Sequence, residues 1–161
     1  MRKVLRFMPS ISAAFIRKAV FSEQTTHAEI TYRMQVADNP IHILCDEQQI
    51  SRMLLNVLKN AAEALEARSD TETKNIITVQ CFSENGQCKV RIFDNGHGFP
   101  SDKIHRLLEP YVTTRAKGTG LGLAIVKKIA DDHKAQLILE NLPTGGACVT
   151  LVVALDSEKI L

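Results

Sequence analysis

The sequence predicts an α+β fold, a two-layer sandwich with three helices on one face of a mixed, mainly antiparallel sheet of about five strands. The middle of the chain carries one long amphipathic segment with helical spacing. Short segments of alternating apolar and polar residues flank it. These segments come in blocks, whereas a parallel doubly wound sheet needs strict alternation of strand and helix. The 161 residues suffice for one domain with a sizeable core.

The first predicted elements are a helix and a strand. Residues 10–24 carry apolar residues at helical spacing, so we expect a helix that starts near Ser10. Residues 29–36 alternate between apolar and polar, which predicts a strand. Residues 38–40 (Asp-Asn-Pro) then predict a turn before a short extended piece.

The longest predicted helix covers about residues 47–67. Asp46 stands where an N-cap residue is expected, because its carboxylate can accept a hydrogen bond from the first turn. Apolar residues then recur at steps of three and four, which predicts one buried face. They are Ile50, Met53, Leu54, Val57, Leu58, Ala61, Ala64 and Leu65.

The second half of the chain carries the remaining strands. Residues 84–86 (Glu-Asn-Gly) join two alternating segments and predict a hairpin turn. The predicted elements, in order, are strands at 76–82 and 88–93, a short helix near 101–107, a helix ending at about His133, and strands at 135–140 and 147–154.

Composition narrows the function classes. Hydrophobic residues at 45% and charged residues at 24% are ordinary for a globular protein. A net charge of +2 and 5% aromatic residues provide neither the basic patch nor the stacking platform of a nucleic-acid-binding protein. No apolar run approaches the ~20 residues of a membrane-spanning helix, so we expect no membrane contact by this segment.

The cysteines indicate a reducing compartment. They form no Cys-x-x-Cys pair, so we expect buried thiols rather than a zinc site or disulfides, and a cytoplasmic location. The four are Cys45, Cys81, Cys88 and Cys148.

The first candidate site segment lies on the long helix. Asn56, Asn60 and Glu63 stand at i, i+4 and i+7, so they share one flank beside the apolar face. Lys59 precedes the second asparagine. Amide oxygens are hard ligands suited to Mg²⁺, and amide nitrogens can donate to phosphate oxygens. A solvated helix flank would use the same residue types, so this segment alone leaves both interpretations open.

The second segment is residues 94–98 (Asp-Asn-Gly-His-Gly). It follows a strand but leads to a helix entry, which argues against a simple hairpin turn. Its glycines would let backbone approach a ligand closely. The Asp94 carboxylate could then accept a hydrogen bond from an exocyclic amine such as that of adenine.

The third segment is residues 118–123 (Gly-Thr-Gly-Leu-Gly-Leu), which open a helix. Glycines followed by the N–H groups of a helix N-terminus make an anion-binding concavity. The segment matches neither a Walker A loop nor the dinucleotide-binding fingerprint.

The order and spacing of these segments resemble a known superfamily. Asn-x-x-x-Asn-Ala from Asn56, Asp-x-Gly-x-Gly from Asp94 and Gly-Thr-Gly-Leu-Gly-Leu from Gly118 resemble the N, G1 and G2 boxes of the GHKL ATPases, which have the Bergerat fold. Residues 109–115 resemble the F-box region and ATP lid of sensor histidine kinases, and residues 6–9 the end of the dimerisation hairpin in their nitrogen-regulation group. The resemblance covers nearly the whole chain and implies the ATP-binding catalytic domain of such a kinase.

The resemblance also implies the cofactors, ATP and Mg²⁺, and a role for each matching residue. Asn60 would coordinate the metal, Asn56 would support metal and phosphate, and Lys59 could reach a phosphate. Asp94 would bind the adenine amine. The residues implied in the adenine wall, the lid and the phosphate cradle are Gly96, Gly98, Thr113, Thr114, Arg115, Lys117, Gly118, Thr119, Gly120, Leu121 and Gly122.

Position 56 separates two activities within the superfamily. Hydrolysing members, such as gyrase-type topoisomerases, carry a glutamate base four residues before the metal-binding asparagine. This chain carries Asn56 there, and an amide cannot take a proton from water at neutral pH. The sequence therefore favours phosphoryl transfer over hydrolysis.

The same resemblance divides the chain and implies its partners. Residues 1–24 would be the end of a dimerisation helix and a linker helix, and residues 25–161 the ATP-binding catalytic domain. None of the five histidines lies in the usual acidic-flanked acceptor motif, so we expect the phosphoacceptor histidine on a separate dimerisation domain and no autophosphorylation of this chain alone. A response regulator would be the further partner, and the parent kinase could be anchored in the inner membrane.

Two alternatives stay open. An anti-sigma-type serine kinase shares the three boxes, although the N-terminal resemblance and the Thr-Thr-Arg sequence at 113–115 argue against it. A degenerate, non-catalytic module that docks response regulators is the other, and the intact asparagines and glycines argue against that one.

Overall fold

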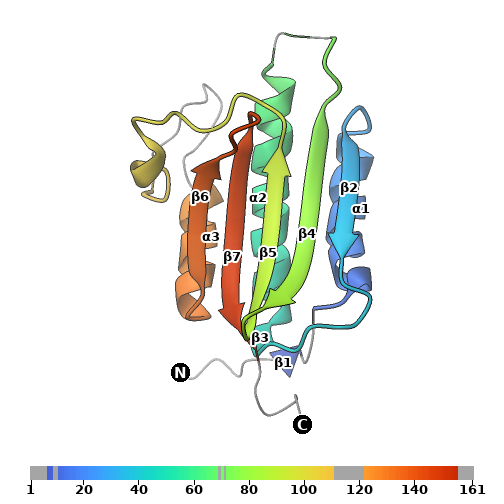
Figure 1. The fold of residues 1–161 in the computed structure, drawn as a ribbon, viewed down its shortest axis with the longest axis vertical. Coiled ribbons are helices and arrows are strands. Elements are labelled where there is room, and N and C mark those ends of the chain that lie inside the picture. Colours follow the sequence, from blue (N-terminus) through green and yellow to red (C-terminus); the bar gives the residue numbers. More distant parts are fainter. Residues whose placement is uncertain (1–6, 9–10, 69, 71, 111–121, 156–161) are drawn as a thin grey trace.

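The computed structural model describes residues 7–8, 11–68, 70, 72–110 and 122–155. Among these, three α-helices pack against one face of a five-stranded sheet with the order β2-β4-β5-β7-β6 (Figure 1). The strands β2 and β4 are parallel, and the other neighbours are antiparallel. The elements are β1 Phe7–Met8, α1 Ala13–Thr26, β2 Thr31–Val36, β3 Cys45–Asp46, α2 Glu47–Glu66, β4 Ile76–Glu84, β5 Gln87–Asp94, the 3₁₀ helix Ile104–Arg106, α3 Gly122–Asp132, β6 Gln136–Asn141 and β7 Ala147–Ala154.

The predicted fold class is confirmed, and most element boundaries agree within a few residues. The first helix starts later than expected, at Ala13, because the Ser12 hydroxyl accepts a hydrogen bond from the Phe15 N–H at 3.2 Å and caps it. The short helix predicted near 101–107 is a single 3₁₀ turn, Ile104–Arg106. A two-stranded pairing of β1 with β3 was not predicted.

The helix α2 lies between α1 and α3 and runs along the middle of the sheet (Figure 1). Its predicted cap is confirmed: Asp46 Oδ1 accepts a hydrogen bond from the Gln49 N–H at 3.2 Å. The apolar face lies in the core, where Leu58 and Leu65 are almost fully buried. The polar flank beside this face therefore has a fixed orientation, because rotating the helix would expose the apolar face to water.

The hairpin of β4 and β5 positions the start of the candidate site. At its turn, Asn85 and Gly86 have φ angles of 52° and 74°, as a type I′ turn requires. Along β5, Cys88, Val90 and Ile92 are buried, so the alternation of the strand places Asp94 on the same, helix-covered side.

The four cysteines are buried, which agrees with the prediction of buried thiols. In the described part of the chain, no helix combines the length and the apolar character needed to cross a bilayer.

The helix α1 buries Ile16, Ala19 and Val20 in the same core as α2.

Candidate functional site

The Asp94 carboxylate is the buried polar centre of the site. Asp94 is the last residue of β5 and is 5% exposed. Its Oδ1 accepts hydrogen bonds from the Gly96 N–H at 2.8 Å and from the Ala147 N–H at 3.3 Å. Two backbone donors hold this oxygen in one place and stabilise a charged carboxylate there.

Asn95 fastens the loop that ends β5, residues 94–98 (the Asp94 loop), to the start of β4. The Asn95 amide accepts from the Ile76 N–H at 2.9 Å and donates to the Lys74 carbonyl at 2.7 Å. Arg68, just beyond the end of α2, donates to the Asn95 carbonyl at 2.6 Å and to the Asn75 side chain at 2.5 Å. Arg68 therefore ties α2 and this loop together.

Two positions around the Asp94 loop require glycine, because another part of the chain lies too close for a Cβ atom. A Cβ on Gly146, whose φ is +104°, would lie 1.9 Å from the Asp94 carbonyl oxygen. A Cβ on Gly98, whose φ is +84°, would lie 2.5 Å from Asn141 Oδ1. The Asn141 side-chain amide accepts a hydrogen bond from the Phe99 N–H at 2.7 Å and donates one to the Phe99 carbonyl at 2.9 Å.

The helix α2 brings the predicted segments together. A Cβ on Gly122, the first residue of α3, would lie 3.2 Å from Asn60 Nδ2 and 3.3 Å from its Oδ1, so the α3 backbone lies against the Asn60 amide. A Cβ on Gly96 would lie 3.4 Å from the Leu65 side chain, five positions further along α2. The asparagine flank, the Asp94 loop and the start of α3 thus meet along one helix.

The remaining helix residues have different surroundings. Asn56 is half-buried and lines a groove of about 1030 Å³ between α1 and the first half of α2, which Ile125 of α3 also borders. Lys59 is exposed and close enough to Glu23 of α1 to lower the pKa of that carboxyl, although burial raises the pKa overall. Lys59 therefore lies near the carboxylate of Glu23, whether or not it also contacts the phosphate of a bound ligand.

Part of the predicted site lies outside the described residues. These positions are Thr113, Thr114, Arg115, Lys117, Gly118, Thr119, Gly120 and Leu121.

Four residues that hold the Asp94 loop were not predicted as site residues. For Asn95 and Gly146, the sequence carries a local signal: one stands inside the Asp-Asn-Gly segment, and the other in a Gly-Gly pair before the last strand. Arg68 and Asn141 carry none, because their partners lie 27 and 42 residues away in the chain.

One protein family matches most of the chain. The family described as histidine kinase-, DNA gyrase B- and HSP90-like ATPases matches residues 45–157, which include Asn56, Asn60, Asp94 and the start of α3.

The chain belongs to this family.

Within this family, the chain is similar to sensor kinases. The nitrogen regulation protein NtrY of Azorhizobium caulinodans is 40% identical over 146 residues, which cover 89% of this chain and 19% of that protein. A putative NtrY-like sensor histidine kinase of Rickettsia bellii is 36% identical over 146 residues, covering 90% of this chain and 23% of that protein. The chain thus spans about a fifth of the length of these curated relatives.

A solved structure confirms the family's fold. The mycobacterial sensor histidine kinase MprB superposes with a TM-score of 0.76 at 24% identity, covering 88% of this chain and 93% of that one. The predicted resemblance to sensor-kinase catalytic domains is therefore confirmed, and neither the serine kinase nor the docking module is favoured.

Proposed function

We propose that this chain binds Mg²⁺–ATP between the Asp94 loop, the asparagine flank of α2 and the start of α3, and donates the γ-phosphoryl group to a histidine on a separate dimerisation domain. The supporting observation is the convergence on α2, where Asn60 lies against Gly122 and Leu65 against Gly96. One rigid helix then sets the distance between the adenine end and the phosphate end of the nucleotide.

The adenine end would use the Asp94 carboxylate. It is buried in a low-dielectric setting and oriented by two backbone donors to Oδ1, so a hydrogen bond from an exocyclic amine there is strong and directional. Gly96 and Gly98 would form the adjacent wall, where the missing side chains let backbone approach the base.

The phosphate end would use the two asparagines. The Asn60 and Asn56 amide oxygens suit Mg²⁺, which prefers oxygen ligands, and the place of Asn60 beside the α3 N-terminus suits an anionic ligand. When bound, Mg²⁺ would neutralise charge on the phosphates, the main requirement of phosphoryl transfer. Lys59 and the lid and glycine-box residues are the further candidates for phosphate contact, namely Thr113, Thr114, Arg115, Lys117, Gly118, Thr119, Gly120, Leu121 and Gly122.

Transfer is favoured over hydrolysis by the residue at position 56. An amide on this flank can orient a phosphate or a metal ligand but cannot remove a proton from an attacking water. The similar proteins are sensor kinases, which supports the same choice. Partners would be the phosphoacceptor domain of the parent kinase and a response regulator, in the cytoplasm. The boundary near residue 24 between linker helix and catalytic domain remains a prediction.

Phosphoryl transfer between separate domains tests this proposal. The chain would be incubated with Mg²⁺, γ-labelled ATP and the histidine-bearing dimerisation hairpin of its parent kinase. We expect acid-labile label on the hairpin, none on the chain alone, and at least about a tenfold loss of label for Asn60→Ala, equal to ~1.4 kcal/mol. The matched control is Asn39→Ala in an exposed turn. Label on the isolated chain's own histidines, or acid-stable label on serine, would contradict the proposal.

A further inference from the structure

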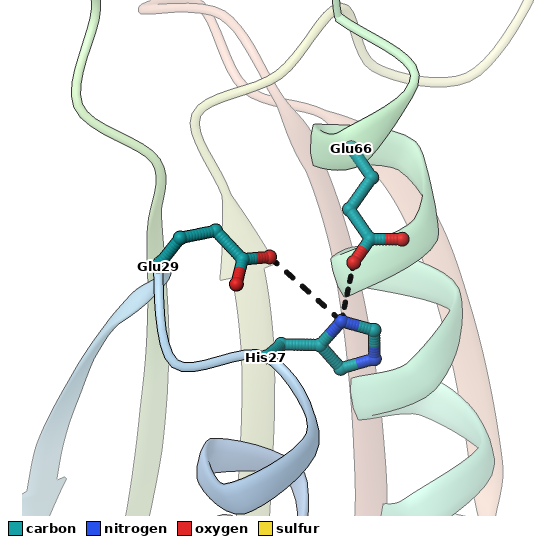
Figure 2. Close-up of side chains that lie close together, drawn as sticks. All are labelled: His27, Glu29 and Glu66. Carbon is teal, nitrogen blue, oxygen red and sulfur yellow. Dashed lines mark hydrogen bonds and ion pairs between the residues drawn. The ribbon is translucent and has the colours of Figure 1, made fainter.

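Four ionisable side chains meet at the C-terminal ends of α1 and α2. His27, the C-cap residue of α1, directs Nδ1 toward Glu66 Oε1 at 2.5 Å and Glu29 Oε1 at 3.9 Å (Figure 2). Its Nε2 faces Glu23 Oε2 at 3.6 Å. One ligand atom from each of His27, Glu29 and Glu66 lies within 4.8 Å of the other two.

We propose that His27, Glu29 and Glu66 bind a divalent transition-metal ion such as Zn²⁺, with Glu23 orienting the imidazole. Histidine nitrogen and carboxylate oxygen are both zinc ligands, and a water molecule would complete four-coordination. An imidazole ligand favours zinc, cobalt or nickel over Mg²⁺ and Ca²⁺, which prefer oxygen alone. This site is separate from the nucleotide site and does not depend on the proposed function.

The geometry requires only small side-chain movements. Tetrahedral zinc with bonds of about 2.0–2.1 Å places its ligand atoms about 3.3 Å apart. The two observed separations, 2.5 Å and 3.9 Å, bracket that value. The Glu29 and Glu66 side chains are 57% and 44% exposed and can rotate to reach it, whereas the His27 side chain is 12% exposed and fixed.

Glu23 supplies an observation beyond the three ligands. Its side chain is 13% exposed, and its buried Oε2 has no hydrogen-bond partner among the described residues. Metal-bound histidines almost always donate their other ring N–H to a carboxylate, which fixes the tautomer and raises the basicity of the ligand nitrogen. Glu23 faces Nε2 and would fix the tautomer that leaves Nδ1 available for the metal.

The charge around the cluster also favours a cation. Burial and the negative charge of Glu23, Glu29 and Glu66 together raise the pKa of Tyr32 to about 12. The Tyr32 hydroxyl is another buried atom without a hydrogen-bond partner in the described part of the chain. A divalent ion would offset this accumulated negative charge.

Zinc titration of the nucleotide-free chain tests the site. Calorimetry with ZnCl₂ in a buffer containing Mg²⁺ should show one saturable site, and Co²⁺ should give the visible absorption of a four-coordinate ion. We expect Glu29→Gln and His27→Gln each to weaken zinc binding more than about tenfold, and Glu23→Gln by about tenfold or more. The matched controls, Glu72→Gln and His105→Gln, change exposed residues elsewhere and should bind zinc like the parent chain.

Either of two results would overturn the proposal. One is no saturable zinc binding, which would make the cluster a set of contacts among side chains without a metal. The other is unchanged affinity in Glu29→Gln, which would place the zinc elsewhere. Because Glu29 is exposed, that variant should fold even if His27→Gln does not, and thermal unfolding of each variant without metal checks this.

Discussion

The Asp94 loop and the asparagine flank of α2 border the same site but are held in place by different forces. In the loop, hydrogen bonds do the positioning: Arg68, Asn95 and Asn141 fasten it to three other segments. On α2, the positioning comes from the buried face, with the Asp46 cap fixing where the helix begins.

This difference predicts how each half responds to substitution. The loop has no space for added atoms, and its geometry depends on polar partners that must all be present. The helix depends on filled apolar volume, which hydrophobic substitutions of similar size preserve. Changes in the loop should therefore alter nucleotide binding as well as stability, whereas changes in the buried face of α2 should act mainly on stability.

The largest effect is expected from Gly146→Ala. The new Cβ would lie 1.9 Å from the Asp94 carbonyl oxygen, so the backbone of β7 or of the loop must move. We expect the free energy of unfolding to fall by more than about 4 kcal/mol, measured by urea unfolding. Gly86→Ala is the control: its φ is also positive, but nothing lies within 4 Å of the new Cβ, so it should cost only about 1–2 kcal/mol. Equal losses in the two variants would contradict the steric explanation.

The next effect is expected from Leu58→Ala in the buried face of α2. Removing this almost fully buried side chain should reduce the free energy of unfolding by about 2–5 kcal/mol. Nucleotide affinity of the folded fraction should change little, because the polar flank and the loop keep their partners. A large loss of affinity without a loss of stability would show that the two halves are not built separately.

A smaller effect is expected from Arg68→Ala. It removes charged hydrogen bonds to the Asn95 carbonyl and the Asn75 side chain, and should cost about 1.5–3 kcal/mol in unfolding free energy. Adenosine affinity should fall as well, because Asn95 adjoins Asp94. Arg33→Ala, an exposed arginine on β2, is the matched control and should leave both quantities unchanged.

The sequence predicted the helix half better than the loop half. Spacing of apolar residues and the cap at Asp46 are local signals, and they were sufficient to place α2 and its asparagine flank. The Asn85-Gly86 turn was local too, and it fixed the register that carries Asp94 to the helix-covered side. Local rules of this kind act over one turn or one hairpin, where sequence and structure correspond directly.

The loop's supports could not be predicted, since they join distant parts of the chain. Arg68 acts on Asn95, and Asn141 on Phe99, through contacts that exist only after the sheet has formed. The parallel pairing of β2 with β4 is a further case, because alternation shows that a strand exists but not which neighbour it pairs with.

Calorimetric titration of nucleotides tests most directly whether the two halves form one site. Mg²⁺–ATP and adenosine would be titrated into the chain and into Asn60→Ala, Asp94→Asn and the control Asn39→Ala. We predict that Asn60→Ala weakens Mg²⁺–ATP by at least about tenfold, or ~1.4 kcal/mol, and leaves adenosine unchanged. Asp94→Asn should weaken both ligands, because it removes the carboxylate that receives the adenine amine. Unchanged Mg²⁺–ATP affinity in Asn60→Ala would contradict the account.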